Sequence, residues 1–178
     1  MKILNELNQI IPSIADNFCK SEKSIFLVHN QVFFTLSCLK HHLNYQFCIL
    51  SCISGVDFLY SKYRFSVVYE LLSLTFNSRL RVKTFVNEIT PINSVTNVYQ
   101  NAGWWEREIW DLYGVYFKNH KDLRRILTDY GFEGFPMRKD YPLSGFIELR
   151  YDQNKKRIIV ETIELSQEFR FFSFESSW

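Results

Sequence analysis

The sequence has no run of about 18 apolar residues, the length at which a helix becomes a candidate membrane span. Residues 1–20 carry Glu6 and Asp16 and lack the apolar block of a secretory signal peptide. The same residues are poor in arginine, unlike a mitochondrial transit peptide. We therefore expect neither a targeting peptide nor a membrane-spanning helix in these 178 residues.

The chain also has almost no excess of positive or negative charge. The formal net charge is +2, which is too small to indicate binding to nucleic acid or to an anionic membrane. Hydrophobic residues make up 47% of the chain, so a packed core is expected, and aromatic residues make up 17%. Because aromatic side chains are preferred anchors of protein interfaces, this share favours a protein that binds other proteins.

The chain has four cysteines and no CxxC pair. Cys48 and Cys52 lie in "QFCILSCIS", a predicted strand on which their even spacing places both side chains on one face. Two interpretations are open: half of a metal or iron–sulfur site, or small apolar residues in the core of a protein from a reducing compartment. We favour the core.

The chain divides into two parts by composition. Residues 1–102 contain few charged residues and predict regular packed structure, an α+β domain. Residues 103–178 contain most of the charged residues and predict a helix followed by an extended, partner-binding C-terminal segment. The glycines mark the same division, since five of them are Gly103, Gly114, Gly131, Gly134 and Gly145.

Hydrophobic periodicity predicts the elements of the first part. Helical spacing runs from Ile3 to Phe18, "SIFLVHN" reads as a strand, and "QVFFTLSCLKHHL" fits a helix. Three further strands are predicted in "YQFCILSCISGVDF", ending near Gly55, in "YRFSVVYELLSLTF" and in "SRLRVKTFV". A turn at Asn77–Ser78 joins the last two as an antiparallel hairpin. The order predicts an α+β fold, with helices packed on one face of a mostly antiparallel sheet and an extended segment after it.

The stretch "WWEREIWDLYG", residues 104–114, has the densest grouping of charged and aromatic residues. Together with the residues before it, from Ser94 onward, it predicts one or two short helices that end at Gly114. On that helix Trp104, Glu108 and Asp111 share a face, and Arg107 is within ion-pair reach of Asp111. Glu106 and Trp110 share another face, so the helix presents acidic groups on two sides.

Two functions are open for this cluster. Glu106, Glu108, Asp111 and His120 together are a candidate divalent metal site of a free-standing enzyme. The stretch lacks a clear nucleophile and a phosphate-binding glycine loop. A structural ion-pair network is the more common use of such a cluster, and we favour it.

The next block, "LRRILTDYGFEGFPMRKDYPLSGFIELRYD", mixes basic and acidic residues with glycines and prolines. A soluble nucleic-acid adaptor would require basic residues without the interleaved acids, and it would bind RNA or DNA with a strong dependence on salt. Prolines stiffen an extended path, so the block is better suited to lying along the surface of another protein.

These residues carry a resemblance. Glu106-Arg107-Glu108, Asp111 with Leu112 and Tyr113, His120, Arg124, Ile126 and Leu127 occur in the order and spacing of one family signature. The chain resembles the 30-kilodalton subunit of respiratory complex I, the proton-pumping NADH:ubiquinone oxidoreductase. The block after the signature and the tail "ELSQEFRFFSFESSW" resemble the same family. "FNSRLRVKTFVNEITPI" is similar to the mitochondrially encoded form, subunit 9. The chain departs from the family pattern at Lys121, where proline is common, and at Phe135, where histidine is frequent.

The resemblance implies a core subunit of the hydrophilic arm, peripheral to the inner mitochondrial membrane on the matrix side. It implies contact with the 49-kilodalton and 20-kilodalton subunits, which reduce quinone, and attachment to the membrane only through the complex. It also implies no catalytic residue, metal, flavin or iron–sulfur cluster in this chain, although the complex uses FMN, iron–sulfur clusters, NADH and ubiquinone. The expected structural and interface residues are Glu106, Arg107, Glu108, Asp111, His120, Arg124 and Arg125, with Arg138, Lys139 and Asp140 anchoring the extended segment.

Overall fold

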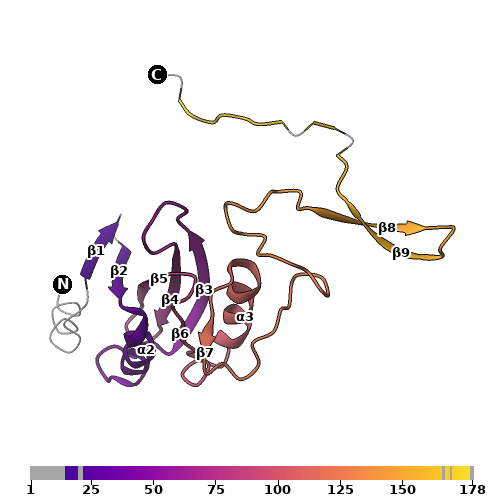
Figure 1. Ribbon diagram of the computed structural model, residues 1–178. Helices are drawn as coiled ribbons and strands as arrows, with labels where there is room; N and C mark the ends of the chain where they lie inside the picture. The colour runs from indigo at the N-terminus through magenta and orange to yellow at the C-terminus, as the bar shows by residue number, and fades with distance from the viewer. Residues whose placement is uncertain (1–14, 20–21, 166, 169, 177–178) are drawn as a thin grey trace. The chain divides into compact units, whose positions relative to one another are not determined.

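The computed structural model describes residues 15–19, 22–165, 167, 168 and 170–176. Among these residues, five strands form the main sheet in the order β1-β2-β5-β4-β3 (Figure 1). The strands are β1 (Ala15–Cys19), β2 (Glu22–Leu27), β3 (Ile49–Asp57), β4 (Phe65–Ser73) and β5 (Ser78–Val86). β2 and β5 run parallel, whereas the other neighbouring pairs are antiparallel.

The predicted hairpin of β4 and β5 forms, but its turn covers residues 74–77 and Ser78 already belongs to β5, whereas the sequence predicted the turn at Asn77–Ser78. In β5, Leu80, Val82 and Val86 are buried, while the basic residues between them face away from the core. The strands meet at Ser73 and Ser78, and the turn between them ends at Asn77, which has a positive φ of 45°. Asparagine tolerates this left-handed conformation better than most residues, so the predicted turn has a local cause.

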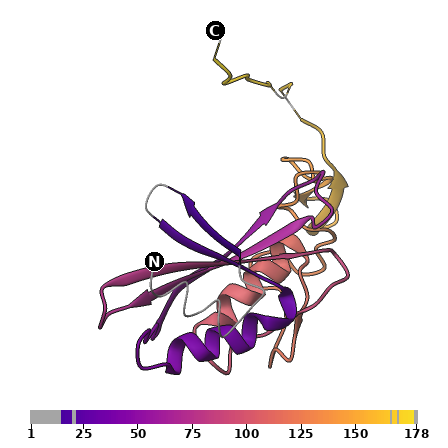
Figure 2. The ribbon, with the colours of Figure 1, turned by 90° about the vertical axis from the view of Figure 1, so that its left-hand side faces the viewer.

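The helices α2 (Val32–His41) and α3 (Ala102–Tyr113) lie on the same side of the sheet (Figure 2). α2 follows a short 3-10 helix, His29–Gln31, and buries Val32, Leu36 and Leu39. α3 buries Ala102 and Ile109 in the same core. The predicted fold class, helices packed on one face of a mostly antiparallel sheet, is therefore confirmed.

β3 continues through Gly55 to Asp57, beyond its predicted end. A Cβ atom at Gly55 would lie 2.7 Å from Cδ2 of Tyr113, which is closer than real contacts allow. The glycine therefore allows α3 to approach the strand and does not mark a turn.

Three further expectations from the sequence are wrong where the structure tests them. The helical stretch expected from Ser94 begins only at Ala102, where α3 starts, and the residues before it form turns. The helix expected up to Phe18 falls mostly outside the described residues, but its described end, Ala15–Cys19, is strand β1 and pairs with β2. Cys48 is exposed and Cys52 is half-buried, so this pair is not part of the core. Cys48 precedes β3, and a bulge between Leu50 and Cys52 breaks the regular alternation on which the expectation was based.

The chain leaves α3 at Gly114, which adopts a left-handed conformation with a φ of 78° and donates its N–H to the carbonyl oxygen of Trp110. It then forms β7 (Phe117–Lys118), which pairs in parallel with β6 (Ile92–Asn93). Turns follow as far as Asp140, where the first of two compact units ends.

The second unit comprises residues 141–178. Its described part contains the antiparallel hairpin of β8 (Ile147–Asp152) and β9 (Arg157–Thr162). Arg150 and Glu161 form a salt bridge of 2.7 Å across the two strands. Across the described part of both units, no helix has the length and apolarity to span a membrane.

Candidate functional site

Glu106 is fully buried on the core-facing side of α3. One carboxylate oxygen accepts a hydrogen bond of 2.8 Å from the backbone N–H of Val95, and the other accepts one of 2.6 Å from the Ser94 hydroxyl. Burial raises the pKa of Glu106 to about 7, because the loss of hydration outweighs the two hydrogen bonds. Glu106 therefore joins α3 to the chain directly after β6.

His120 lies beside Glu106 after β7. Its Nε2 atom is 3.3 Å from the carbonyl oxygen of Gly103 and 3.7 Å from a carboxylate oxygen of Glu106. Its Nδ1 atom accepts a hydrogen bond of 3.1 Å from the backbone N–H of Asp122. A neutral ring with its hydrogen on Nε2 satisfies the contacts with both Gly103 and Asp122. The ring therefore holds the chain after β7 against the first half of α3.

Asp111 is fully buried at the other end of α3. One carboxylate oxygen accepts hydrogen bonds from the backbone N–H groups of Ile126, Leu127 and Thr128, at 3.2, 2.7 and 2.9 Å. The other oxygen accepts one of 2.6 Å from the Thr128 hydroxyl. Burial raises the pKa of Asp111, but these hydrogen bonds outweigh it and hold the pKa below its ordinary value.

Arg125 extends the contacts of Asp111 to a more distant part of the chain. Its Nη1 atom lies 3.5 Å from Asp111, and both terminal nitrogens donate hydrogen bonds of 2.9 Å to the carbonyl oxygen of Gly134. Its guanidinium group also lies over the Phe135 ring, 5.0 Å from the ring centre. Asp111 and Arg125 together fix the path of residues 125–135.

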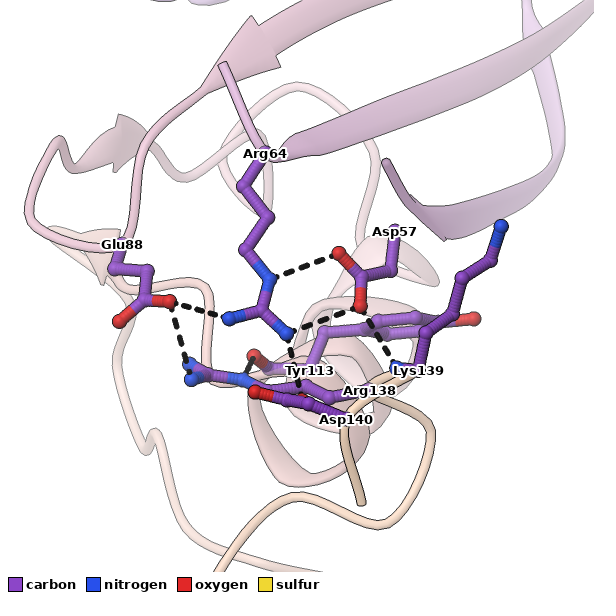
Figure 3. A network of polar contacts seen from close by, with 7 residues as sticks. All are labelled: Asp57, Arg64, Glu88, Tyr113, Arg138, Lys139 and Asp140. Atoms are coloured by element: carbon purple, nitrogen blue, oxygen red, sulfur yellow. Dashed lines mark hydrogen bonds and ion pairs between the residues drawn. The ribbon is translucent and has the colours of Figure 1, made fainter. Parts of the chain in front are cut away.

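A second polar network is centred on Arg64, directly before β4 (Figure 3). The guanidinium group of Arg64 contacts Asp57 at 2.9 Å, Glu88 at 2.7 Å and Asp140 at 2.7 Å. These carboxylates raise the pKa of Arg64 above its ordinary value. Arg64 thus connects the end of β3 with residues far along the chain.

Arg138, Lys139 and Asp140 reach the Arg64 network by three different routes (Figure 3). Nη1 of Arg138 lies 3.5 Å from Glu88, while its Nε donates a hydrogen bond of 2.8 Å to the carbonyl oxygen of Tyr113, at the end of α3. The backbone N–H of Lys139 donates one of 2.8 Å to Asp57, whereas Asp140 pairs with Arg64 through its side chain. Residues 138–140 are therefore held by both side-chain and backbone contacts, and the contact of Lys139 does not use its ammonium group.

Gly114 lies where the end of α3 meets the side chains of Phe135 and Arg138, and a larger residue would not fit there. A Cβ atom there would lie 2.7 Å from Nη2 of Arg138 and 2.7 Å from two ring atoms of Phe135. The guanidinium group of Arg138 lies over the Phe135 ring, 4.5 Å from its centre. Phe135, a departure from the family pattern, therefore packs against the arginine that holds residues 138–140 in place.

The other predicted residues lie closer to solvent. Arg107 does not pair with Asp111: its guanidinium group lies over the ring of Trp104, 4.3 Å from the ring centre. Arg124 is exposed and pairs with Asp122 at 3.0 Å. Glu108 is half-buried and has no ion-pair partner among the described residues.

The four residues of the metal-site hypothesis do not converge. Glu106 and Asp111 are five positions apart, which places them about 140° apart around a helix. Their carboxylates accept hydrogen bonds from different parts of the chain. Glu106 binds Ser94 and Val95, whereas Asp111 binds residues 126–128. In the described part of the chain, no three His, Cys, Asp or Glu side chains are grouped so that they could hold a metal ion.

Sequence reasoning missed the partners of these charges. Asp57 lies beyond the predicted end of its strand, and Arg64 was only one residue of the next predicted strand. Ser94 stood at the start of the predicted helical stretch, and Thr128 lay in the mixed-charge block after it. No local signal pointed to these partners, because the local hydrogen bonds of serine and threonine go to nearby backbone groups. Ser94 and Thr128 instead bind carboxylates 12 and 17 positions away. Nothing in the sequence paired Arg64 with Asp140, because they are 76 positions apart.

Comparisons with known proteins agree with the resemblance. The model of the family "Respiratory-chain NADH dehydrogenase, 30 Kd subunit" matches residues 27–147. NADH-ubiquinone oxidoreductase subunit 9 of Reclinomonas americana is 53% identical over a region that covers 97% of this chain and 85% of the length of that protein. NADH dehydrogenase [ubiquinone] iron-sulfur protein 3 of Oryza sativa subsp. japonica is 54% identical over 86% of this chain and 81% of its own.

A solved structure shares the fold at lower identity. A chain of the membrane-bound sulfane sulfur reductase, an archaeal respiratory membrane complex, superimposes with a TM-score of 0.68. It covers 80% of this chain and 85% of its own, with 21% sequence identity. The family match and the two relatives carry the stronger conclusion: the chain belongs to the family of the 30-kilodalton subunit of respiratory-chain NADH dehydrogenase, a hydrophilic-arm subunit of NADH:ubiquinone oxidoreductase.

Proposed function

We propose that this chain is a structural and assembly subunit, which binds the quinone-reducing 49-kilodalton and 20-kilodalton subunits through residues 103–178 and carries no redox centre of its own. The two buried carboxylates support a structural role. Glu106 and Asp111 are bonded to the chain's own backbone and hydroxyl groups, so their oxygens are already used in holding the fold.

The observation that carries the proposal is the exposed apolar surface of the second unit. The hairpin of β8 and β9 leaves both of its faces largely open to solvent. Its exposed apolar side chains are Ile147, Leu149, Tyr151, Ile158 and Val160. An isolated two-stranded hairpin is marginally stable in water, so this hairpin would be stabilised if another subunit covered its apolar side chains.

The Arg64 network supports the same role. Asp57 lies in the main sheet and Asp140 is the last residue of the first unit, and both bind Arg64. Lys139 binds Asp57 through its backbone. The chain is thus fixed directly before the hairpin unit begins. A fixed starting point reduces the conformational entropy that the hairpin unit loses when it binds a partner.

The place of action follows from the relatives. NADH-ubiquinone oxidoreductase subunit 9 and NADH dehydrogenase [ubiquinone] iron-sulfur protein 3 are named as parts of a ubiquinone-reducing enzyme. We infer that this chain works in the same complex, on the matrix side of the inner mitochondrial membrane, and reaches the membrane only through its partners. FMN, iron–sulfur clusters, NADH and ubiquinone are then bound by other subunits.

Affinity isolation tests this function. An epitope tag on this chain is used to isolate it from mildly solubilised organellar membranes, and the bound proteins are identified by mass spectrometry. The proposal predicts recovery of the 49-kilodalton and 20-kilodalton subunits in amounts equal to the chain, with NADH:ubiquinone reductase activity in the isolate. Recovery of the chain without these subunits would contradict it.

A further inference from the structure

A hollow of about 420 Å³ lies where α3 faces the loop after β7. Its charged and aromatic lining comprises Trp104, Arg107, His120, Lys121, Asp122 and Arg124. We call it the Arg107 hollow. All these residues belong to the first compact unit.

The lining of the Arg107 hollow is basic. It has three cationic side chains, Arg107, Lys121 and Arg124, and one carboxylate, Asp122. With His120 neutral, the sum of 3 positive charges and 1 negative charge is +2. Asp122 already pairs with Arg124 at 3.0 Å, so the excess positive charge is that of Arg107 and Lys121.

The side chain of Arg107 is positioned by contacts within the chain that leave its terminal nitrogens able to bind a ligand. Its guanidinium group lies over the Trp104 ring, and its Nε atom contacts the carbonyl oxygen of Gly103 at 3.4 Å. Among the described residues, its terminal nitrogens have no hydrogen-bond partner. An arginine held in this way presents a planar pair of donors, which matches the two oxygens of a carboxylate.

The other buried or half-buried arginines of this region are already used within the chain. Arg64 binds three carboxylates, Arg125 binds Gly134 and Asp111, and Arg138 binds Tyr113 and Glu88. Arg107 stands apart because its strongest contact is an aromatic ring that is itself 65% exposed. Tryptophan and arginine are among the residues most enriched where binding energy concentrates at protein interfaces.

We propose that the Arg107 hollow receives an aspartate or glutamate side chain of a neighbouring subunit of the complex, which binds Arg107 and Lys121 while its apolar portion lies against Trp104. This inference rests on the proposed function, because it requires the chain to be assembled with other subunits. It separates the predicted interface residues into two groups. Glu106 and Asp111 hold the fold, whereas Arg107 and Lys121 face the partner.

Lys121 permits a direct test in the assembled complex. A carbodiimide joins an amine to a carboxylate that it contacts and adds no spacer. The proposal predicts that Lys121 becomes linked to an aspartate or glutamate of another subunit, which peptide mass spectrometry identifies. It also predicts that an amine-acetylating reagent modifies Lys121 several-fold more slowly in the complex than after dissociation of the complex.

Two variants sharpen the test. Trp104→Ala removes the ring that holds Arg107, and Arg107→Gln removes its charge, while both leave the buried contacts of Glu106 and Asp111 in place. Both variants are expected to lower the yield of the Lys121 cross-link and to make the chain dissociate from the complex at lower salt. Arg79→Gln, at an exposed position of β5, serves as the control and is expected to change neither.

The outcomes distinguish this inference from the function on which it rests. If the chain is isolated with the complex but Lys121 is acetylated as fast as in the dissociated state, the hollow faces solvent and the inference fails, while the proposed function stands. If Lys121 is protected but is linked only to carboxylates of its own chain, or is protected by added inorganic phosphate alone, a partner carboxylate is not the occupant. If the chain does not co-purify with the complex, both fail.

Discussion

Asp111 fixes the chain after β7, so its replacement is expected to destabilise the first unit. In Asp111→Ala, three backbone N–H groups and the Thr128 hydroxyl lose their acceptor. A buried donor without a partner costs about 1–3 kcal/mol, and part of that cost is relieved when the loop opens to water. We therefore expect the free energy of unfolding to fall by about 3–5 kcal/mol, the range seen when one partner of a buried charged contact is removed.

Asp111→Asn separates shape from charge. Its side-chain oxygen can still accept from residues 126–128, and its amide can donate to the Thr128 hydroxyl. Only the charge and the contact with Arg125 are lost, so we expect a cost of about 1–2 kcal/mol. Thr128→Val removes a single hydrogen bond to the same carboxylate and is expected to cost about 1 kcal/mol.

The effect of pH follows from the lowered pKa of Asp111. Because the pKa in the folded state lies below that of the unfolded chain, the carboxylate stabilises the fold at every pH above the unfolded pKa. That stability is lost as the pH falls through the folded pKa. The difference between the wild-type chain and Asp111→Asn is therefore expected to be constant near neutral pH and to shrink in acid.

Urea unfolding of the full chain measures these differences, with tryptophan fluorescence as the signal. Trp104, Trp105 and Trp110 all lie on α3, so the signal reports on the helix that carries Asp111. A loss of less than about 0.5 kcal/mol in Asp111→Ala, the range of ordinary surface substitutions, would refute the reasoning. A loss in Asp111→Asn as large as that in Asp111→Ala would show that charge, and not the geometry of the acceptor, holds the loop.

Three further predictions concern single positions. Burial raises the pKa of Glu106 from 4.5 to about 7, so the wild-type chain is expected to lose about 3 kcal/mol of stability as the pH rises through that window. Glu106→Gln is not expected to show this loss. A difference in stability between the two chains that urea unfolding finds to be independent of pH would contradict this. Gly114→Ala is expected to lower stability by about 1–3 kcal/mol, from its left-handed φ and its contact with Phe135 and Arg138, and an unchanged urea midpoint would show that these side chains move aside freely. Arg64→Gln leaves Asp57 buried without its cation and is expected to speed limited proteolysis between residues 136 and 145, whereas an unchanged cleavage pattern would show that the Arg64 network does not anchor the segment.

Local patterns in the sequence predicted much of the fold. The alternation in β5, the turn at Asn77 and the stop of α3 at Gly114 depend on a few neighbouring residues, so the sequence alone predicts them. Gly55 was misread because its cause is distant: it makes room for Tyr113 of α3. Cys52 was misplaced because a bulge shifts the register after Leu50, and Cys48 was misplaced because it lies before β3 begins.

The charged cluster shows the same division between local and distant causes. The helix spacing correctly separates Glu106 from Trp104 and Asp111. Trp104 and Asp111 share one face of α3, yet Trp104 is exposed and Asp111 is buried, because residues 126–128 cover only the second end of that face. Which charges are used within the fold and which remain free depends on such tertiary contacts, and spacing along one helix cannot predict them.

The most direct test of the account is a native gel of mildly solubilised organellar membranes. The gel is stained for NADH-dependent dye reduction, and the same lane is probed with an antibody against this chain. The account predicts that the chain migrates with the large band that oxidises NADH. Migration of the chain alone, near its own 21.4 kDa, would contradict its role as a subunit of the complex.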